Sequence, residues 1–157
     1  MLKSIRYAGA ICALAAAGFV SAQGALEKPD VHIAVGGKAA LYYLPLTITE
    51  QLGYFKAEGL NVKISDFKGG SAALRAVVGG SADVVSGAYE HTINMQARGQ
   101  KFQAFVLQGR APQISIGVST AKVPNYKSPK DLKGLKIGVS APGSSTNMFA
   151  NYVLEKG

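Results

Sequence analysis

The stretch NVKISDFKGGSAALRAVVGGSADVVSG, residues 61–87, decides the fold. Its first seven residues are typical of a β-strand, with Val62 and Ile64 alternating with polar residues, and Gly69-Gly70 then predicts a turn. The sequence next predicts a helix from Ala72 to Val78, ended by Gly79-Gly80, and a short buried strand from Asp83 to Ser86. Strands and helices joined by short glycine turns indicate a parallel sheet with right-handed crossovers.

Similar units flank this stretch. The sequence predicts four more strands, at 31–35, 101–108, 114–120 and 135–140, and three more helices, at about 45–52, 89–98 and 144–156. In the first of these helices, Leu44, Ile48 and Leu52 recur on one face. The strand at 61–67 is the most polar of the set, which places it at the edge of a doubly wound sheet with 2-1-3-type strand order.

The character of the chain changes after Gly109, where the strand-like run at 114–120 leads into a polar segment. Residues 121–133 are polar, rich in lysine and contain two prolines, as is typical of a solvated segment that crosses between lobes. We therefore expect a first α/β lobe at 23–118, a crossing segment at 119–134 and the first strand–helix unit of a second, truncated lobe at 135–157. That last unit has no neighbouring strand of its own lobe, so we expect the chain to be the N-terminal part of a longer protein.

Residues 1–22 have the pattern of a signal peptide. Lys3 and Arg6 precede an uncharged apolar run that ends in Val20-Ser21-Ala22, which predicts cleavage after Ala22 and export to the periplasm. The run is shorter than the roughly 20 residues that span a bilayer, so a retained anchor is the weaker alternative.

Cleavage would leave a mature chain without cysteine, because Cys12 is the single cysteine of the sequence. That excludes disulfides, a thiol nucleophile and cysteine-ligated metals. Without Lys3 and Arg6, 15 basic and 9 acidic residues remain, a net charge of +6. This charge is compatible with an anionic ligand, a membrane surface or nucleic acid, but no interleaving of basic and aromatic residues indicates nucleic acid.

Ligands bind beyond the carboxyl ends of the strands in open α/β sheets, and the turns predicted there carry the polar side chains. A helix that begins at Ser144 leaves its first N–H groups unpaired and attracts an anion, and Ser71 offers a matching set of donors. Both serines could instead be ordinary N-caps, and the tyrosines and the lysine could be packing and surface residues. The candidate ligand-binding residues are Lys38, Tyr42, Tyr43, Gly70, Ser71, Tyr89, Glu90, Ser144, Ser145 and Thr146.

Catalytic motifs are incomplete. GGSAA, residues 69–73, lacks the final glycine of a nucleophile elbow, and no histidine follows His91 to complete a triad. No phosphate loop or dinucleotide fingerprint occurs. We therefore expect no enzyme activity, no cofactor and no metal, and we expect His91 to be structural, with a role as ligand contact or general base as the alternative.

Three segments taken in order carry a family resemblance: GYFKAEGLNVKI (53–64), GGSAALRAVVGGSADV (69–84) and SPKDLKGLKIGVSAPGSS (128–145). Together they resemble the periplasmic solute-binding proteins of nitrate/sulfonate/taurine-type ABC importers, within the pyrimidine-precursor-synthesis-like superfamily. The resemblance implies a type II periplasmic-binding-protein-like α/β fold, with a ligand held between two lobes by turns that correspond to 38–43, 70–71, 89–90 and 144–146.

The resemblance also implies the function. We expect a monomeric substrate-binding component that captures a small anionic or organic solute, such as a sulfonate, nitrate or taurine, and delivers it to a permease in the inner membrane. The alternatives are a pyrimidine-precursor-synthesis-type enzyme of the same superfamily, with His91 in a catalytic role, and a basic surface adhesin.

Overall fold

A computed structural model of the protein describes residues 25–157. The predicted signal peptide, its cleavage after Ala22 and Cys12 lie outside the described residues. Within them, no helix is both long enough and apolar enough to cross a membrane.

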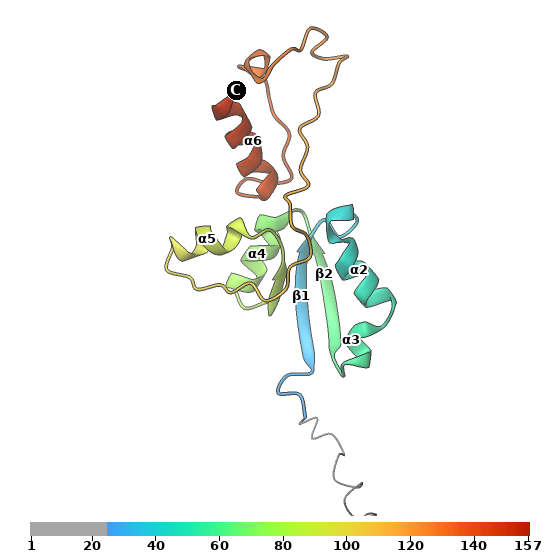
Figure 1. Cartoon of the computed structure of the whole chain (residues 1–157). Coiled ribbons are helices and arrows are strands. Elements are labelled where there is room, and N and C mark those ends of the chain that lie inside the picture. Colours follow the sequence, from blue (N-terminus) through green and yellow to red (C-terminus); the bar gives the residue numbers. More distant parts are fainter. Residues whose placement is uncertain (1–24) are drawn as a thin grey trace, which may run out of the picture.

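A parallel three-stranded sheet organises the first lobe (Figure 1). Its strands are β1 (Asp30–Gly36), β2 (Asn61–Phe67) and β3 (Val84–Ser86), in the order β2-β1-β3. Ile33 of β1 lies opposite Ile64 on one side and Val84 on the other. The predicted parallel sheet, its strand order and the edge position of β2 are all confirmed.

Helices cover both faces of this sheet, with α2 and α3 on one side and α4 and α5 on the other (Figure 1). The helical elements of the lobe are the 3₁₀ turn η2 (Leu41–Tyr43), α2 (Leu44–Gln51), α3 (Tyr54–Ala57), α4 (Gly70–Val78) and α5 (Glu90–Gln96). The short helix α3 was not predicted. It begins after Gly53, whose φ of 73° turns the chain sharply after α2.

Alternation along β1 divides the core into two layers. Ile33 and Val35 pack with Tyr43 and Leu46 beneath α2, whereas Ala34 packs against α4 on the opposite face. Small side chains on that second face, Ala34, Ala73 and Ala82, allow α4 to lie close to the sheet. The core therefore sits directly under the strand ends that carry the candidate site.

The sequence predicted that Leu44, Ile48 and Leu52 form the buried face of α2, and this prediction is wrong. Leu44, Ile48 and Leu52 are 45%, 43% and 61% exposed, and Leu46 is the residue of α2 that is buried. Tyr43, the last residue of η2, is buried in the core immediately before α2 begins. The position of Tyr43 fixes the rotation of α2 about its axis, so that Leu46 faces the sheet.

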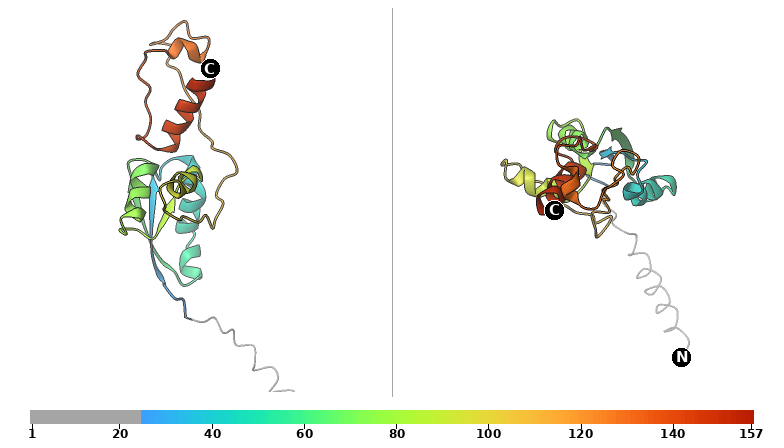
Figure 2. Two further views of the ribbon diagram at one scale, coloured as in Figure 1. Left: turned by 90° about the vertical axis from the view of Figure 1, so that its left-hand side faces the viewer. Right: turned by 90° about the horizontal axis from the view of Figure 1, so that it is seen from above.

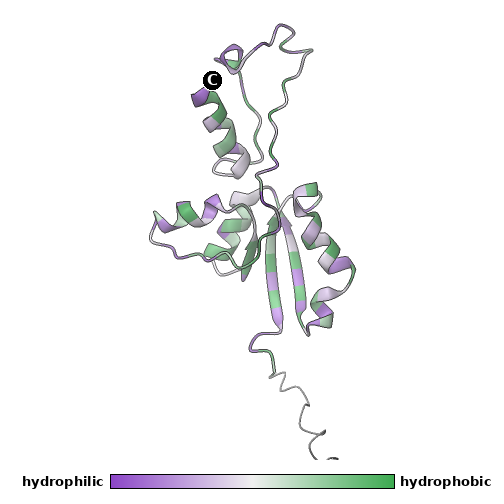
Figure 3. Cartoon of the chain, in the orientation of Figure 1, coloured by the Kyte–Doolittle hydropathy of each residue, from purple (hydrophilic) through white to green (hydrophobic). Residues whose placement is uncertain are grey.

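The strands predicted at 101–108, 114–120 and 135–140 do not form. A strand needs a neighbour to pair its backbone groups, and these runs have none. The first passes β3, where the Ser86 hydroxyl donates to Gln108 at 3.3 Å, but it makes no ladder hydrogen bonds. The other two line a groove of ≈510 Å³. Figure 3 shows hydrophobic residues along these runs by colour. Among them, Phe105 and Leu107 are 76% and 74% exposed.

Two further helical elements belong to the C-terminal unit, which we define as residues 119–157. A 3₁₀ turn, η3 (Pro129–Leu132), interrupts the polar segment, and a capping box of Ser128 and Asp131 begins it. The final helix α6 (Ser145–Lys156) begins as predicted, with Ser144 as its N-cap. The five lysines between residues 119 and 136 are exposed, as expected for a solvated surface: Lys122, Lys127, Lys130, Lys133 and Lys136.

The C-terminal unit stands over the carboxyl ends of the strands, with the start of α6 nearest to them (Figures 1 and 2). Two contacts join it to the first lobe there. Gly69 lies against Ser140 and Ala141, and Asn94 of α5 donates to the sulfur of Met148 at 3.3 Å. The candidate ligand-binding residues therefore lie close to a junction between two parts of the chain.

Candidate functional site

Gly36 brings the end of β1 against the start of α4. A Cβ atom at Gly36 would lie 2.2 Å from the backbone carbon of Gly69 and 2.3 Å from the nitrogen of Gly70. Such distances are far inside van der Waals contact, so only glycine allows this approach. Gly36 thereby holds the first turn of α4 at the carboxyl end of the central strand.

Ser71 lies in this first turn, but it is not the N-cap that the sequence suggested. Gly69 occupies the cap position with φ 98°, and no side chain caps the helix. The Ser71 residue is 7% exposed, and its hydroxyl has no hydrogen-bond partner within the described residues. A buried hydroxyl without a partner is costly to stability, which points to another use for it.

His91 of α5 approaches the same turn, and Glu90 precedes it at the start of that helix. The His91 residue is 4% exposed, and its Nε2 lies 3.1 Å from the position that a Cβ of Gly70 would take. Both His91 Nε2 and Glu90 Oε1 are buried without a partner among the described residues. Burial lowers the pKa of His91, and the Glu90 carboxylate partly opposes this, so the imidazole is neutral at pH 7.

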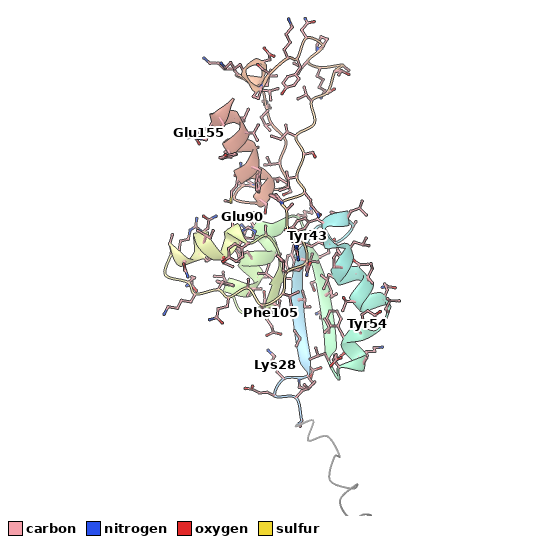
Figure 4. The ribbon with its side chains drawn as sticks, in the orientation of Figure 1. Lys28, Tyr43, Tyr54, Glu90, Phe105 and Glu155 are labelled. Atoms are coloured by element: carbon pink, nitrogen blue, oxygen red, sulfur yellow. The ribbon has the colours of Figure 1, made fainter. Side chains whose placement is uncertain are left out.

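Tyr42 and Tyr43 form the wall on the α2 side. Their rings meet edge to face, with centroids 5.0 Å apart and planes at 84°. Burial raises the pKa of Tyr43 to about 12, with smaller contributions from Tyr42, Asp66 and Glu90. Burial and then Glu90 raise the pKa of Tyr42 as well. Both phenols therefore stay protonated, and Glu90 is their common electrostatic neighbour; Figure 4 labels Tyr43 and Glu90 below the start of α6.

The turn at Gly37-Lys38 is held by Asp66, which the sequence analysis missed. Asp66 Oδ1 accepts the N–H of Gly37 at 2.7 Å and that of Lys38 at 2.9 Å. The Lys38 ammonium forms an ion pair with Glu50 of α2. Asp66 lies opposite Val35 in the sheet register, so its position at the end of the predicted edge strand was the signal that could have identified it.

At the start of α6, the hydroxyls bond mainly to one another. Ser144 is 1% exposed, donates to the carbonyl of Ala141 at 2.7 Å and accepts the N–H of Asn147 at 3.4 Å. Thr146 Oγ1 accepts the N–H of Ser140 at 3.0 Å and lies 2.9 Å from the Ser144 hydroxyl. These groups stabilise the turn at 140–146, while the half-buried Ser145 takes no part in the network.

Tyr89 lies apart from the other candidates. It is 68% exposed and lines a separate hollow of ≈350 Å³ with Ile93 and Phe102. The structure instead brings His91, which the sequence analysis expected to be structural, next to Gly70.

The first-lobe cluster consists of Tyr42, Tyr43, Ser71, Glu90 and His91. It offers two phenol hydroxyls, a serine hydroxyl, a carboxylate and a neutral imidazole. Within residues 25–157, no group of three or more His, Cys, Asp or Glu side chains could hold a metal ion. Such a set can bind a small polar molecule by several hydrogen bonds.

Comparison with known proteins places the chain in a family. Residues 40–157, more than half of its length, match the family model described as "NMT1/THI5 like". The chain belongs to the NMT1/THI5-like family. This agrees with the resemblance seen in the sequence, because the superfamily contains both solute-binding proteins and pyrimidine synthases.

Two curated relatives show that NMT1/THI5-like chains are named for different activities. One is named "Putative binding protein YtlA" of Bacillus subtilis, 31% identical over 62 residues, which are 40% of this chain and 19% of the relative. The other is 4-amino-5-hydroxymethyl-2-methylpyrimidine phosphate synthase of Schizosaccharomyces pombe, 30% identical over 101 residues, which are 64% of this chain and 29% of the relative. The chain thus spans less than a third of either relative.

A solved structure from Bordetella bronchiseptica RB50 is 67% identical, with a TM-score of 0.82 over 84% of this chain and 42% of that one. At this similarity the two share a fold. The NMT1/THI5-like match and this neighbour together show a partial periplasmic-binding-protein-like α/β fold, as the resemblance implied.

Proposed function

We propose that this chain is the substrate-binding component of an ABC importer, which captures a small anionic or organic solute such as a sulfonate, nitrate or taurine and delivers it to a permease. The observation that carries the proposal is a set of three buried polar atoms near the carboxyl ends of the strands that have no hydrogen-bond partner within residues 25–157: Ser71 Oγ, Glu90 Oε1 and His91 Nε2. A bound ligand would satisfy them. The match to a family that includes a relative named as a binding protein supports the same function.

Ligand capture would be coupled to a movement between the two parts of the chain. The contact of Gly69 with Ser140 and Ala141 and the hydrogen bond from Asn94 to Met148 close the junction over the first-lobe cluster. A ligand that touches both sides stabilises the closed arrangement selectively, because the open arrangement lacks half of the contacts. The signal-peptide pattern at 1–22 supports export to the periplasm, and we propose a monomer there.

Isothermal titration calorimetry of the full-length gene product tests this function. The panel contains sulfonates, nitrate, bicarbonate, aromatic acids and pyrimidines. We expect at least one saturable ligand, and Ser71→Ala should weaken its binding while the protein remains folded by circular dichroism. Absence of heat with every compound would remove the support for a binding protein of small solutes.

A second candidate is a pyrimidine-precursor-synthesis-type enzyme. It is favoured by the 30% identity to the fission yeast synthase and by the position of His91 inside the cluster. The two functions differ in the fate of the ligand. Mass spectrometry after prolonged incubation with a bound pyrimidine should return the compound unchanged, whereas a new product that disappears in His91→Ala would establish the enzyme.

A further inference from the structure

The carboxylate of Glu90 has no cationic partner. Within the part of the chain that the structure describes, the ion pairs are Lys28 with Asp83 and Lys38 with Glu50. Lys38 is therefore already paired with another carboxylate. A carboxylate is solely an acceptor of hydrogen bonds when ionised. Glu90 Oε1 is nonetheless buried with no donor among the described residues.

The groups around Glu90 do not supply a positive charge either. Its electrostatic neighbours are the protonated phenols of Tyr42 and Tyr43 and the neutral imidazole of His91. Glu90 is only partly buried, but its buried oxygen has lost contact with water without gaining a hydrogen-bond donor, and a ligand group of opposite charge would compensate for that loss. A bare anion beside Glu90 would instead add repulsion between like charges.

The start of α4 has the complementary chemistry. The N–H groups of Gly70 and Ser71 belong to the first turn of a nine-residue helix and have no acceptor within it. The Ser71 hydroxyl, which has no partner among the described residues, lies in the same turn, and only 7% of Ser71 is exposed. Helix N-termini favour the negative end of a ligand, so an oxyanion suits this side of the cluster.

We infer that the site takes a small molecule with two ends, a cationic nitrogen that donates to Glu90 and an oxyanion held by the first turn of α4. This rests on the proposed function and narrows its substrate class. Glu90 is then the residue that determines specificity, because it distinguishes such a molecule from a simple anion of the same size. Inorganic nitrate and amine-free sulfonates lack the group that Glu90 requires.

Matched probe pairs test the inference by calorimetry on the full-length gene product. Taurine is compared with ethanesulfonate, and β-alanine with propionate, since each pair differs by the amine alone. We expect the amine-bearing member of at least one pair to bind 10-fold or more tightly than its partner. A hydrogen bond to a charged group is worth about 10- to 100-fold in affinity, so Glu90→Gln should weaken the amine-bearing probe by that factor.

Two variants make the result specific. Glu155→Gln removes an exposed carboxylate of α6 that lies away from the cluster (Figure 4) and should leave every affinity unchanged. Glu90→Asp keeps the charge and should retain the preference for the amine-bearing probe, although at lower affinity. If Glu90→Gln does not fold by circular dichroism, the comparison of Glu90→Asp with the unmodified protein carries the test.

The outcomes separate the inference from the function on which it rests. If the amine-free member of each pair binds as tightly as its amine-bearing partner, or Glu90→Gln weakens both members of a pair equally, the inference is overturned while the binding function stands. If neither these probes nor the broader panel bind, both are overturned. Preference for the amine that is lost in Glu90→Gln and retained in Glu155→Gln supports both.

Discussion

The starts of α4 and α6 contain the same kinds of residue but use them in opposite ways. Each follows a glycine with positive φ, Gly69 or Gly143, and each has a buried serine close to that glycine. In α6, Ser144 is the N-cap, and its hydroxyl is engaged by the backbone. In α4, Ser71 lies inside the helix, and its hydroxyl has no partner in the described part of the chain.

The difference arises from one additional glycine. Gly69 takes the cap position with φ 98° and ψ 158°, a conformation that favours glycine, and Gly70 then begins the helix. The serine is displaced from the cap into the first turn. Ser144, by contrast, has extended backbone angles of −81° and 167°, which suit a serine cap. Ser144 therefore stabilises α6 as its N-cap, whereas the hydroxyl of Ser71 is available to a ligand.

The largest effect is expected from Gly36→Ala, which breaks the start of α4. The added Cβ would meet the backbone of Gly69 and Gly70 at 2.2 and 2.3 Å, so β1 or α4 must shift. We expect the free energy of unfolding to fall by about 3 kcal/mol in urea denaturation, the upper range for overpacking.

Gly138→Ala is the matched control for Gly36→Ala. A Cβ at Gly138 would meet no atom within 4 Å, and its backbone does not have positive φ. It should change the unfolding free energy by less than about 0.5 kcal/mol. Equal stabilities of the two variants would show that the close approach of β1 to α4 is absent in solution.

The next largest effect separates the two serines. Ser144→Ala removes an N-cap and should cost about 1 kcal/mol of unfolding free energy. Ser71→Ala removes a buried hydroxyl that has no partner among the described residues, so it should leave the free energy of unfolding unchanged or slightly raised, while it weakens ligand binding. Urea denaturation and calorimetry on the same preparations measure both quantities. A similar loss of stability in both variants would mean that Ser71 has a structural role after all.

The sequence predicted the sheet well because its signals are local. Alternating apolar residues, glycine turns and the polar character of β2 are all properties of short segments, and they determine the strand order β2-β1-β3. The runs at 101–108, 114–120 and 135–140 have the same local pattern but remain unpaired. Whether an apolar run becomes a strand depends on a partner strand, which a local pattern does not specify.

The position of the candidate site follows from a general rule of α/β folds, whereas the details of its contacts do not. The rule that ligands bind at the carboxyl ends of parallel strands located Ser71, Glu90 and the tyrosines. The ion pair of Lys38 with Glu50 depends on how α2 is rotated, and the apolar pattern of α2 predicted that rotation wrongly. The burial of His91 against Gly70 depends on packing between α4 and α5.

A smaller effect is expected from pH, through His91. Its pKa in the folded protein lies below the ordinary value of 6.5, mainly because of burial. The unfolded chain therefore binds a proton at a pH where the folded chain does not, and stability should fall as the pH decreases below about 6.5. Urea denaturation between pH 7.5 and 5 measures this loss, and His91→Gln should reduce it. A stability profile identical to that of the unmodified protein would show that His91 is not buried in solution.

The smallest effect is expected from Lys38→Gln. This variant compares a side chain that already has an ion-pair partner, Lys38, with Glu90, which has none among the described residues. The side chains of Lys38 and Glu50 are 28% and 30% exposed, and partly exposed pairs contribute roughly 0.5 kcal/mol, less at high salt. The turn itself should persist, because Asp66 holds the N–H groups of Gly37 and Lys38 rather than the ammonium. Ligand affinity should therefore change much less in Lys38→Gln than in Glu90→Gln. If calorimetry shows the reverse, the ammonium leaves Glu50 on ligand binding, and Lys38 rather than the start of α4 neutralises the oxyanion.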